Sequence, residues 1–223
     1  QGRPERAADL RDAIAFLHPG DRPGPAGEVY LCWQRAVARP VSIKALHRAL
    51  PEVDADQIAT WLDAGQGAPV PRAATVLQAV LHARPRDLAA ALILADAALA
   101  QALGWTHLIP ILALGLKRRD LHTTDPTLRR ACDGAIVSAV PDILRRTAEL
   151  TRRAGKLQAV APKLRAKGAA QAVAVFLTRE AVAATALTSL GSPRAARRFC
   201  DRLVELGVAR ELTGRDTFRL YGV

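Results

Sequence analysis

The sequence predicts a mainly α-helical fold that ends in a small β-hairpin. Aromatic residues make up only 4% of the chain while alanine and leucine are abundant, which favours helices with small, close-packed interfaces. Signals for helix starts, such as Ser-Pro and Asp-Pro, precede several amphipathic stretches. Near the end, a glycine follows the last helical stretch and two short segments flank a turn. With 223 residues, half of them apolar and 24% charged, the chain can form a soluble globule of one large or two small domains.

The first predicted helix covers residues 5–17 and stops at a segment rich in proline and glycine, residues 18–27. This segment is either a linker or a rigid packed loop, and the loop is favoured because apolar residues resume at Val29. Capping residues and periodicity then predict helices at 42–50, 54–64, 72–83, 87–103 and 108–118.

Asp125-Pro126 predicts the start of a long helix that continues toward Arg153. Pro141 should kink or split this helix, and Gly155 should end it. Two shorter helices are predicted at 168–177 and 179–187.

The last predicted helix, residues 193–206, begins at a serine cap, Ser192, followed by a proline in the first turn. Residues placed at 100° intervals form a buried stripe on one side and an arginine cluster on the opposite side. The stripe contains Ala196, Phe199, Leu203 and Leu206, and the cluster contains Arg194, Arg197 and Arg198.

The arginine cluster lies at the positive end of the helix dipole, where cations weaken a helix by about 0.3–1 kcal/mol each. Binding of the arginines to the phosphate backbone of a nucleic acid would explain this placement. The alternative is a solvated helix face on which Arg197 pairs with Asp201, and for a single helix the two interpretations weigh about evenly.

The residues after this helix favour the phosphate interpretation. Residues 208–212 and 217–221 predict two strands joined by a turn at 213–216 that carries Arg215. A glycine-terminated helix followed by such a hairpin is typical of a winged helix-turn-helix, whose recognition helix enters the major groove of double-stranded DNA. The expected backbone contacts are Arg202, Arg215 and the Ser192 hydroxyl. Winged helices also serve as protein-docking modules, so that alternative stays open.

The formal net charge of +11 lies entirely in residues 117–223, because residues 1–116 hold as many acidic as basic residues. Such asymmetry predicts a polyanionic partner for the second half. Within residues 145–167 the arginines before Gly155 could be the wet face of a helix. Three cations further along are expected to contact DNA: Lys163, Arg165 and Lys167. Replacing Lys163 or Arg165 should weaken binding evenly across DNA sequences.

Three stretches of the chain resemble an uncharacterised bacterial family that carries only a domain-of-unknown-function label. They read HPGDRPGPAG at residues 18–27, VAPKLRAKGA at 160–169 and RAARRFCDRLVELGVARELTGRDTFRLYGV at 194–223. The resemblance implies a bacterial, cytoplasmic setting, often on plasmids and mobile elements. It also implies that helical sequence precedes this chain, in keeping with the absence of a starting methionine.

The sequence contains no pattern typical of an enzyme. It lacks HExxH, GxxxxGK[ST], GxGxxG after a strand and GxSxG, and its three cysteines show no CxxC pair. No catalytic residue, metal site or cofactor is therefore predicted. Asp96 is an unusual carboxylate within an apolar stretch, and we expect it to be buried and hydrogen-bonded to a loop or helix end rather than functional.

These observations predict an α-helical domain at 1–155 and a winged-helix domain at 156–223. The expected function is non-enzymatic DNA binding by a protein of a bacterial mobile element, in regulation, plasmid maintenance or partition. A homodimer is a reasonable expectation, and no membrane span is predicted. One alternative is an interaction subunit of a larger nucleoprotein or defence complex, and a weaker one is an enzyme with a ligand pocket in the helical domain.

Overall fold

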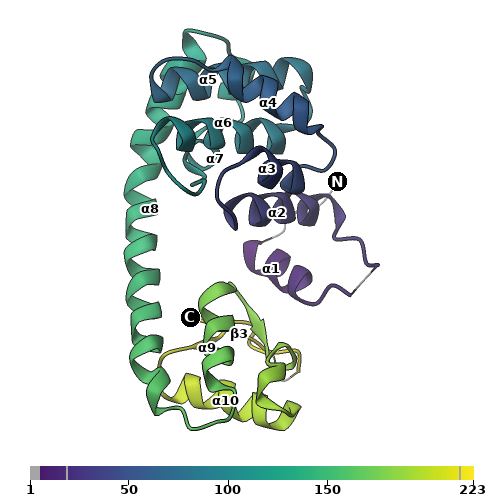
Figure 1. Ribbon diagram of the computed structural model, residues 1–223, viewed down its shortest axis with the longest axis vertical. Coiled ribbons are helices and arrows are strands. Elements are labelled where there is room, and N and C mark those ends of the chain that lie inside the picture. Colours follow the sequence, from purple (N-terminus) through teal and green to yellow (C-terminus); the bar gives the residue numbers. More distant parts are fainter. Residues whose placement is uncertain (1–5, 19, 216) are drawn as a thin grey trace. The chain divides into compact units, whose positions relative to one another are not determined.

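The computed structural model describes residues 6–18, 20–215 and 217–223. It divides into two compact units: unit 1 comprises Gln1–Gly27 and Arg145–Val223, and unit 2 comprises Glu28–Leu144. Two helices, α2 (Gly24–Val37) and α8 (Thr127–Val160), contribute to both units. The sequence-based boundary at residue 155 lies within α8, whereas the units divide between residues 144 and 145. Figure 1 labels these elements.

Unit 2 is helical, and most of its helices begin where the sequence predicts. The Ser42 side chain accepts a hydrogen bond from the Ala45 backbone N–H at 3.2 Å and caps its helix as expected. Asp54, the other predicted cap, precedes the helix that starts at Ala55 but makes no side-chain cap hydrogen bond, whereas Asp87 accepts one from the Ala90 N–H at 3.1 Å. The elements are α3 (Ile43–Ala49), α4 (Ala55–Ala64), α5 (Pro69–Ala83), α6 (Leu88–Ala102), α7 (Ile111–Gly115) and a 3-10 turn (Asp120–His122).

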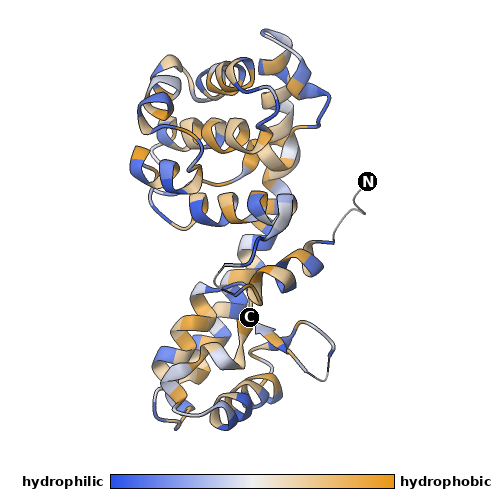
Figure 2. Cartoon of the chain, turned by 90° about the vertical axis from the view of Figure 1, so that its right-hand side faces the viewer, coloured by the Kyte–Doolittle hydropathy of each residue, from blue (hydrophilic) through white to orange (hydrophobic). Residues whose placement is uncertain are grey.

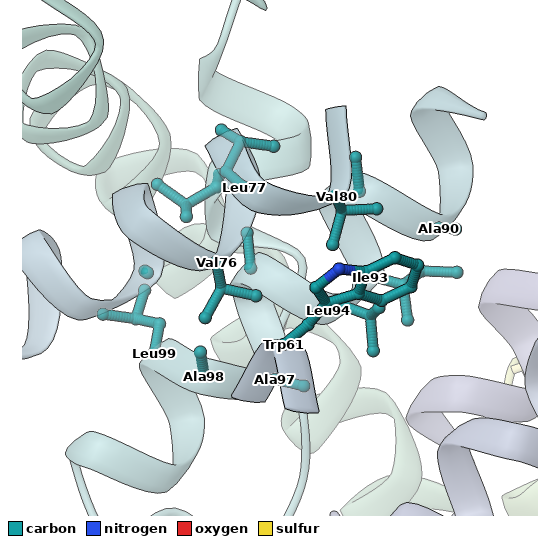
Figure 3. Close-up of a cluster of buried hydrophobic side chains, with 14 of the residues drawn as sticks. Trp61, Val76, Leu77, Val80, Ala90, Ile93, Leu94, Ala97, Ala98 and Leu99 are labelled. Atoms are coloured by element: carbon teal, nitrogen blue, oxygen red, sulfur yellow. The ribbon is translucent and has the colours of Figure 1, made fainter. Parts of the chain in front are cut away.

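Helix α6 forms the centre of the unit 2 core. Ten of its fifteen residues are buried, among them six alanines, whose small side chains allow neighbouring helices to approach closely. Figure 3 shows the adjoining part of the core, where Trp61 of α4 and Val76 and Val80 of α5 lie beside residues of α6. The alanine-rich composition thus produces close-packed helices, as expected from the sequence.

The buried carboxylate of Asp96 lies at the start of α7, as expected from the sequence. Its two oxygens accept hydrogen bonds from the backbone N–H groups of Leu112 at 2.8 Å and Ala113 at 3.2 Å. Burial raises the pKa of Asp96 to about 7, and the backbone hydrogen bonds only partly oppose this rise. Asp96 therefore has a structural role: it ties α6 to the N-terminus of α7.

The raised pKa of Asp96 predicts that wild-type stability decreases as pH rises. An unfolded aspartate releases its proton near pH 4, whereas folded Asp96 keeps it until about pH 7. Its contribution to stability is thus complete below pH 4 and is lost as pH rises through 7, at about 1.4 kcal/mol per unit of pKa difference. We expect Asp96→Asn to flatten this dependence in urea unfolding between pH 5 and 8. The exposed control Asp56→Asn should keep the wild-type slope.

Unit 1 combines the first helix of the chain with its last 79 residues and contains a small antiparallel sheet. Its elements are α1 (Ala7–Ala15), the end of α8, a 3-10 turn (Ala161–Lys163), α9 (Ala169–Thr178), β1 (Val182–Ala183), two 3-10 turns (Ala184–Ala186 and Thr188–Leu190), α10 (Pro193–Glu205), β2 (Arg210–Glu211) and β3 (Leu220–Gly222).

The sheet has three strands in the order β1-β3-β2, not the two predicted. Val182 pairs with Tyr221, and Arg210 pairs with Gly222. The predicted helix at 179–187 is therefore wrong, since this segment forms β1 and a 3-10 turn. The pairing of Val182 with a residue near the end of the chain overrides the local helical pattern.

Other boundaries also differ from the sequence predictions. Helix α2 begins at Gly24, inside the segment predicted as loop, and α7 is shorter than the predicted 108–118. Helix α8 continues through both Pro141 and Gly155. Leu157, which follows Gly155 in α8, is fully buried in the core of unit 1, so tertiary packing outweighs the low helix propensity of glycine there.

Candidate nucleic-acid interface

Helix α10 begins and packs largely as the sequence predicts. The Ser192 hydroxyl accepts a hydrogen bond from the Ala195 backbone N–H at 3.2 Å, and Pro193 is the first helical residue. Ala196, Phe199 and Leu203 are buried, as predicted. Two residues differ: Leu206 is 37% exposed because the helix ends before it, and Cys200 completes the buried stripe instead.

The predicted arginine cluster lies on the solvent-exposed side of α10. The side chains of Arg194, Arg197 and Arg198 are exposed, and none forms an ion pair with another residue in the described part of the chain. In particular, the alternative pairing of Arg197 with Asp201 is not formed. Figure 2 shows the hydrophilic residues that dominate this helix, at the bottom of the view.

Arg202 differs from the other arginines of α10. It forms an exposed ion pair with Glu205, with the Arg202 Nη1 atom 3.1 Å from the Glu205 Oε2 atom. Such exposed pairs contribute little to stability and exchange readily, so Arg202 can still turn to another anion.

The predicted phosphate contacts Lys163, Arg165 and Lys167 are exposed in a segment that leads into α9. This segment is held near the start of α10 by a close backbone approach. Gly168, with φ of 82°, lies against the 3-10 turn that precedes Ser192, and the Ser189 hydroxyl donates to the Gly168 carbonyl oxygen at 3.1 Å. The residue that ends the basic segment thus lies against the turn before α10, although Gly168 and Ser189 are 21 residues apart in the sequence.

Arg215 is exposed in the loop between β2 and β3; Asp216, which was predicted in the same turn, lies outside the described residues. The Glu211 carboxylate organises the start of this loop by accepting hydrogen bonds from the backbone N–H groups of Thr213 and Gly214. The hydrogen bond from the Thr213 hydroxyl is the main cause that lowers the pKa of Glu211. A turn fixed in this way holds Arg215 outside the sheet.

Sequence reasoning missed the contribution of helix α1 to this loop. The Phe16 and Phe218 rings pack edge to face with centroids 5.7 Å apart, and Arg11 donates to the Leu212 carbonyl oxygen at 3.4 Å. These partners are about 200 residues apart in the sequence, so no local pattern could have indicated the contact.

The described residues contain no group of three or more His, Cys, Asp or Glu side chains that could hold a metal ion. Cys32, Cys132 and Cys200 carry free thiols, and burial raises the pKa of both Cys132 and Cys200 to about 12. These two thiols therefore stay protonated and unreactive at neutral pH. Within the described ranges, every helix is too short or too polar to span a lipid bilayer.

A family described as "Protein of unknown function (DUF1403)" matches residues 1–223. The chain belongs to this family. The match extends over the whole sequence and agrees with the resemblance noted from the three stretches above. Searches of curated proteins and of solved structures each found no match to this DUF1403 chain.

Proposed function

We propose that the protein binds double-stranded DNA through a winged helix formed by residues 169–223, with α10 as the recognition helix. Two features support this assignment, the order of the elements along the chain and the order of the strands in the sheet. The elements follow one another as α9, β1, two 3-10 turns, α10, β2, a loop and β3, and the sheet has the order β1-β3-β2. Residues 184–190, where a second helix is usual in such folds, form 3-10 turns instead.

The observation that carries the proposal is the exposed arginine cluster at the N-terminus of α10. A 13-residue helix is about 20 Å long, and the major groove of DNA is about 12 Å wide, so α10 can enter with its first turns. The cluster adds three positive charges to the positive end of the helix dipole: Arg194, Arg197 and Arg198. This arrangement weakens the isolated helix, but it strengthens the attraction to a phosphate group.

The remaining candidate residues fit contacts to the DNA backbone. The exposed segment that carries Lys163, Arg165 and Lys167 ends at Gly168, which lies against the turn before α10. Ser192 can donate its hydroxyl hydrogen, and Arg215 is exposed in the loop between β2 and β3. Arg202, further along α10, would exchange Glu205 for a phosphate. Unit 1 also holds twice as many basic as acidic residues, whereas unit 2 is nearly balanced. We therefore assign the DNA contact to unit 1 and propose a role in regulation, maintenance or partition of a bacterial mobile element.

The direct test is fluorescence anisotropy of the full chain with a labelled mixed-sequence DNA duplex over a range of salt concentrations. Contact with six to eight phosphates predicts that log K decreases with log salt with a slope of about −5 to −7. Absence of binding at low salt, or a slope near zero, would contradict the proposal.

A second candidate function, a protein-docking subunit, is favoured by one observation. Phe218, in the loop between β2 and β3, is 72% exposed with φ of 55°, and large exposed aromatic side chains are typical of protein contacts. If docking rather than DNA binding is the role, the full chain should bind duplexes weakly and co-purify with a partner, and Phe218→Ser should release that partner.

A further inference from the structure

Unit 1 contains a hollow of about 620 Å³ that the proposed DNA contact does not use. We call it the arginine groove. Its walls are residues of α8 between 146 and 154, the C-terminal end of α9 with the following residues, and strands β2 and β3. Its lining includes five arginines: Arg11, Arg146, Arg153, Arg179 and Arg210. A smaller hollow of about 190 Å³, which adds Arg152 and Lys156, shares Arg153 and Arg210 with it.

The arginines of the groove differ in their partners. Arg11 pairs with Asp12 at 2.6 Å, and Arg153 pairs with Glu149. Arg179 and Arg210 are exposed and form no ion pair with another residue in the described ranges. Two guanidinium groups on the same groove therefore lack a protein anion, and each offers several N–H donors suited to phosphate or carboxylate oxygens.

The rest of the lining indicates the kind of anion that fits. Leu150, Leu177 and Leu212 give the groove an apolar surface, and Glu149 and Glu180 add two carboxylates. Carboxylates repel an extended phosphate backbone, so the groove suits a compact anion better than a nucleic-acid strand. The volume lies within the range of about 300–1,000 Å³ typical of small-molecule sites.

We propose that the arginine groove binds a phosphorylated small molecule of about nucleotide size, with its phosphate held by Arg179 and Arg210 and its less polar part against Leu177 and Leu212. No residue of α10 lines the groove. Arg210 lies five residues after the end of α10, in the strand that leads to the loop carrying Arg215. The ligand site is thus distinct from the proposed DNA contact, and variants can separate the two.

The test is isothermal titration calorimetry of the full chain at low salt with four probes: ATP, GTP, glucose 6-phosphate and uncharged adenosine. We expect at least one phosphorylated probe to bind and adenosine to bind at least tenfold more weakly. The double variant Arg179→Gln with Arg210→Gln should weaken binding of that probe at least tenfold. The matched control, Arg197→Gln with Arg198→Gln, removes the same charge from α10. It should change the affinity for that phosphorylated probe less than twofold.

Three results would overturn the proposal: no phosphorylated probe binds, the groove variant binds it as wild type does, or both double variants weaken it equally. A fourth concerns DNA. If the groove variant loses duplex affinity as strongly as the α10 variant, the groove is part of the DNA contact and not a small-molecule site. Both arginines are exposed, so circular dichroism should show an unchanged melting temperature for the groove variant.

Discussion

Replacing Arg194, Arg197 and Arg198 together with alanine should weaken duplex DNA binding by at least about a hundredfold at moderate salt. These side chains are exposed on the first two turns of α10 and lack ion-pair partners within the described residues, so their charges are available to DNA. If all three contact phosphates, the salt slope should become shallower by about 3, because each contact contributes about 0.9. Anisotropy titrations at several salt concentrations measure both effects.

A matched control removes the same charge from unit 2. Arg48, Arg86 and Arg130 are exposed and also lack ion-pair partners among the described residues. Their triple alanine variant should keep the wild-type affinity within about threefold and keep the salt slope. Equal losses in the two triple variants would mean that net charge alone governs binding and that α10 is not a recognition helix.

Replacing Gly168 with alanine should lower the stability of unit 1 by about 3 kcal/mol or more. At φ of 82° a side chain costs about 1–2 kcal/mol, and the added Cβ would lie 2.1 Å from the Ser189 carbonyl oxygen, so the backbone must move. The same shift would separate the segment carrying Lys163, Arg165 and Lys167 from the start of α10. Thermal and urea unfolding measure the stability loss, and duplex binding of the remaining folded protein should also weaken.

Gly191 provides the control for this prediction. It has a similar φ of 76°, but no atom lies within 4 Å of the position that a Cβ would occupy. Gly191→Ala should therefore show only the conformational cost, about 1–2 kcal/mol. If the two variants lose equal stability, the close approach between Gly168 and Ser189 is not what holds the basic segment in place.

The sequence predicts the elements that depend on local signals. Ser192 and Pro193 define the start of α10, and the spacing of Ala196, Phe199 and Leu203 defines its buried side. The exposure of the arginine cluster then follows from helix geometry alone. These features needed no knowledge of distant parts of the chain.

The missed features all depend on contacts between distant residues. Strand β1 exists because Val182 pairs with Tyr221, and the arginine groove exists because Arg11, Arg153 and Arg179 converge from three separate segments. Local periodicity cannot indicate such pairings, because it reports only on neighbours within a few turns. The winged helix and its DNA contact stay predictions that the binding experiments test.

The discontinuity of unit 1 has a consequence for synthesis on the ribosome. Helix α1 leaves the exit tunnel about 200 residues of synthesis before its partners Leu212 and Phe218 are made. At about 5–20 residues per second, roughly ten seconds or more of translation separate the two. During that interval Phe16 lacks the Phe218 ring, so nascent chains should expose it to chaperones. A fragment that starts after α1 should lose the Phe16 and Arg11 contacts that hold the loop between β2 and β3.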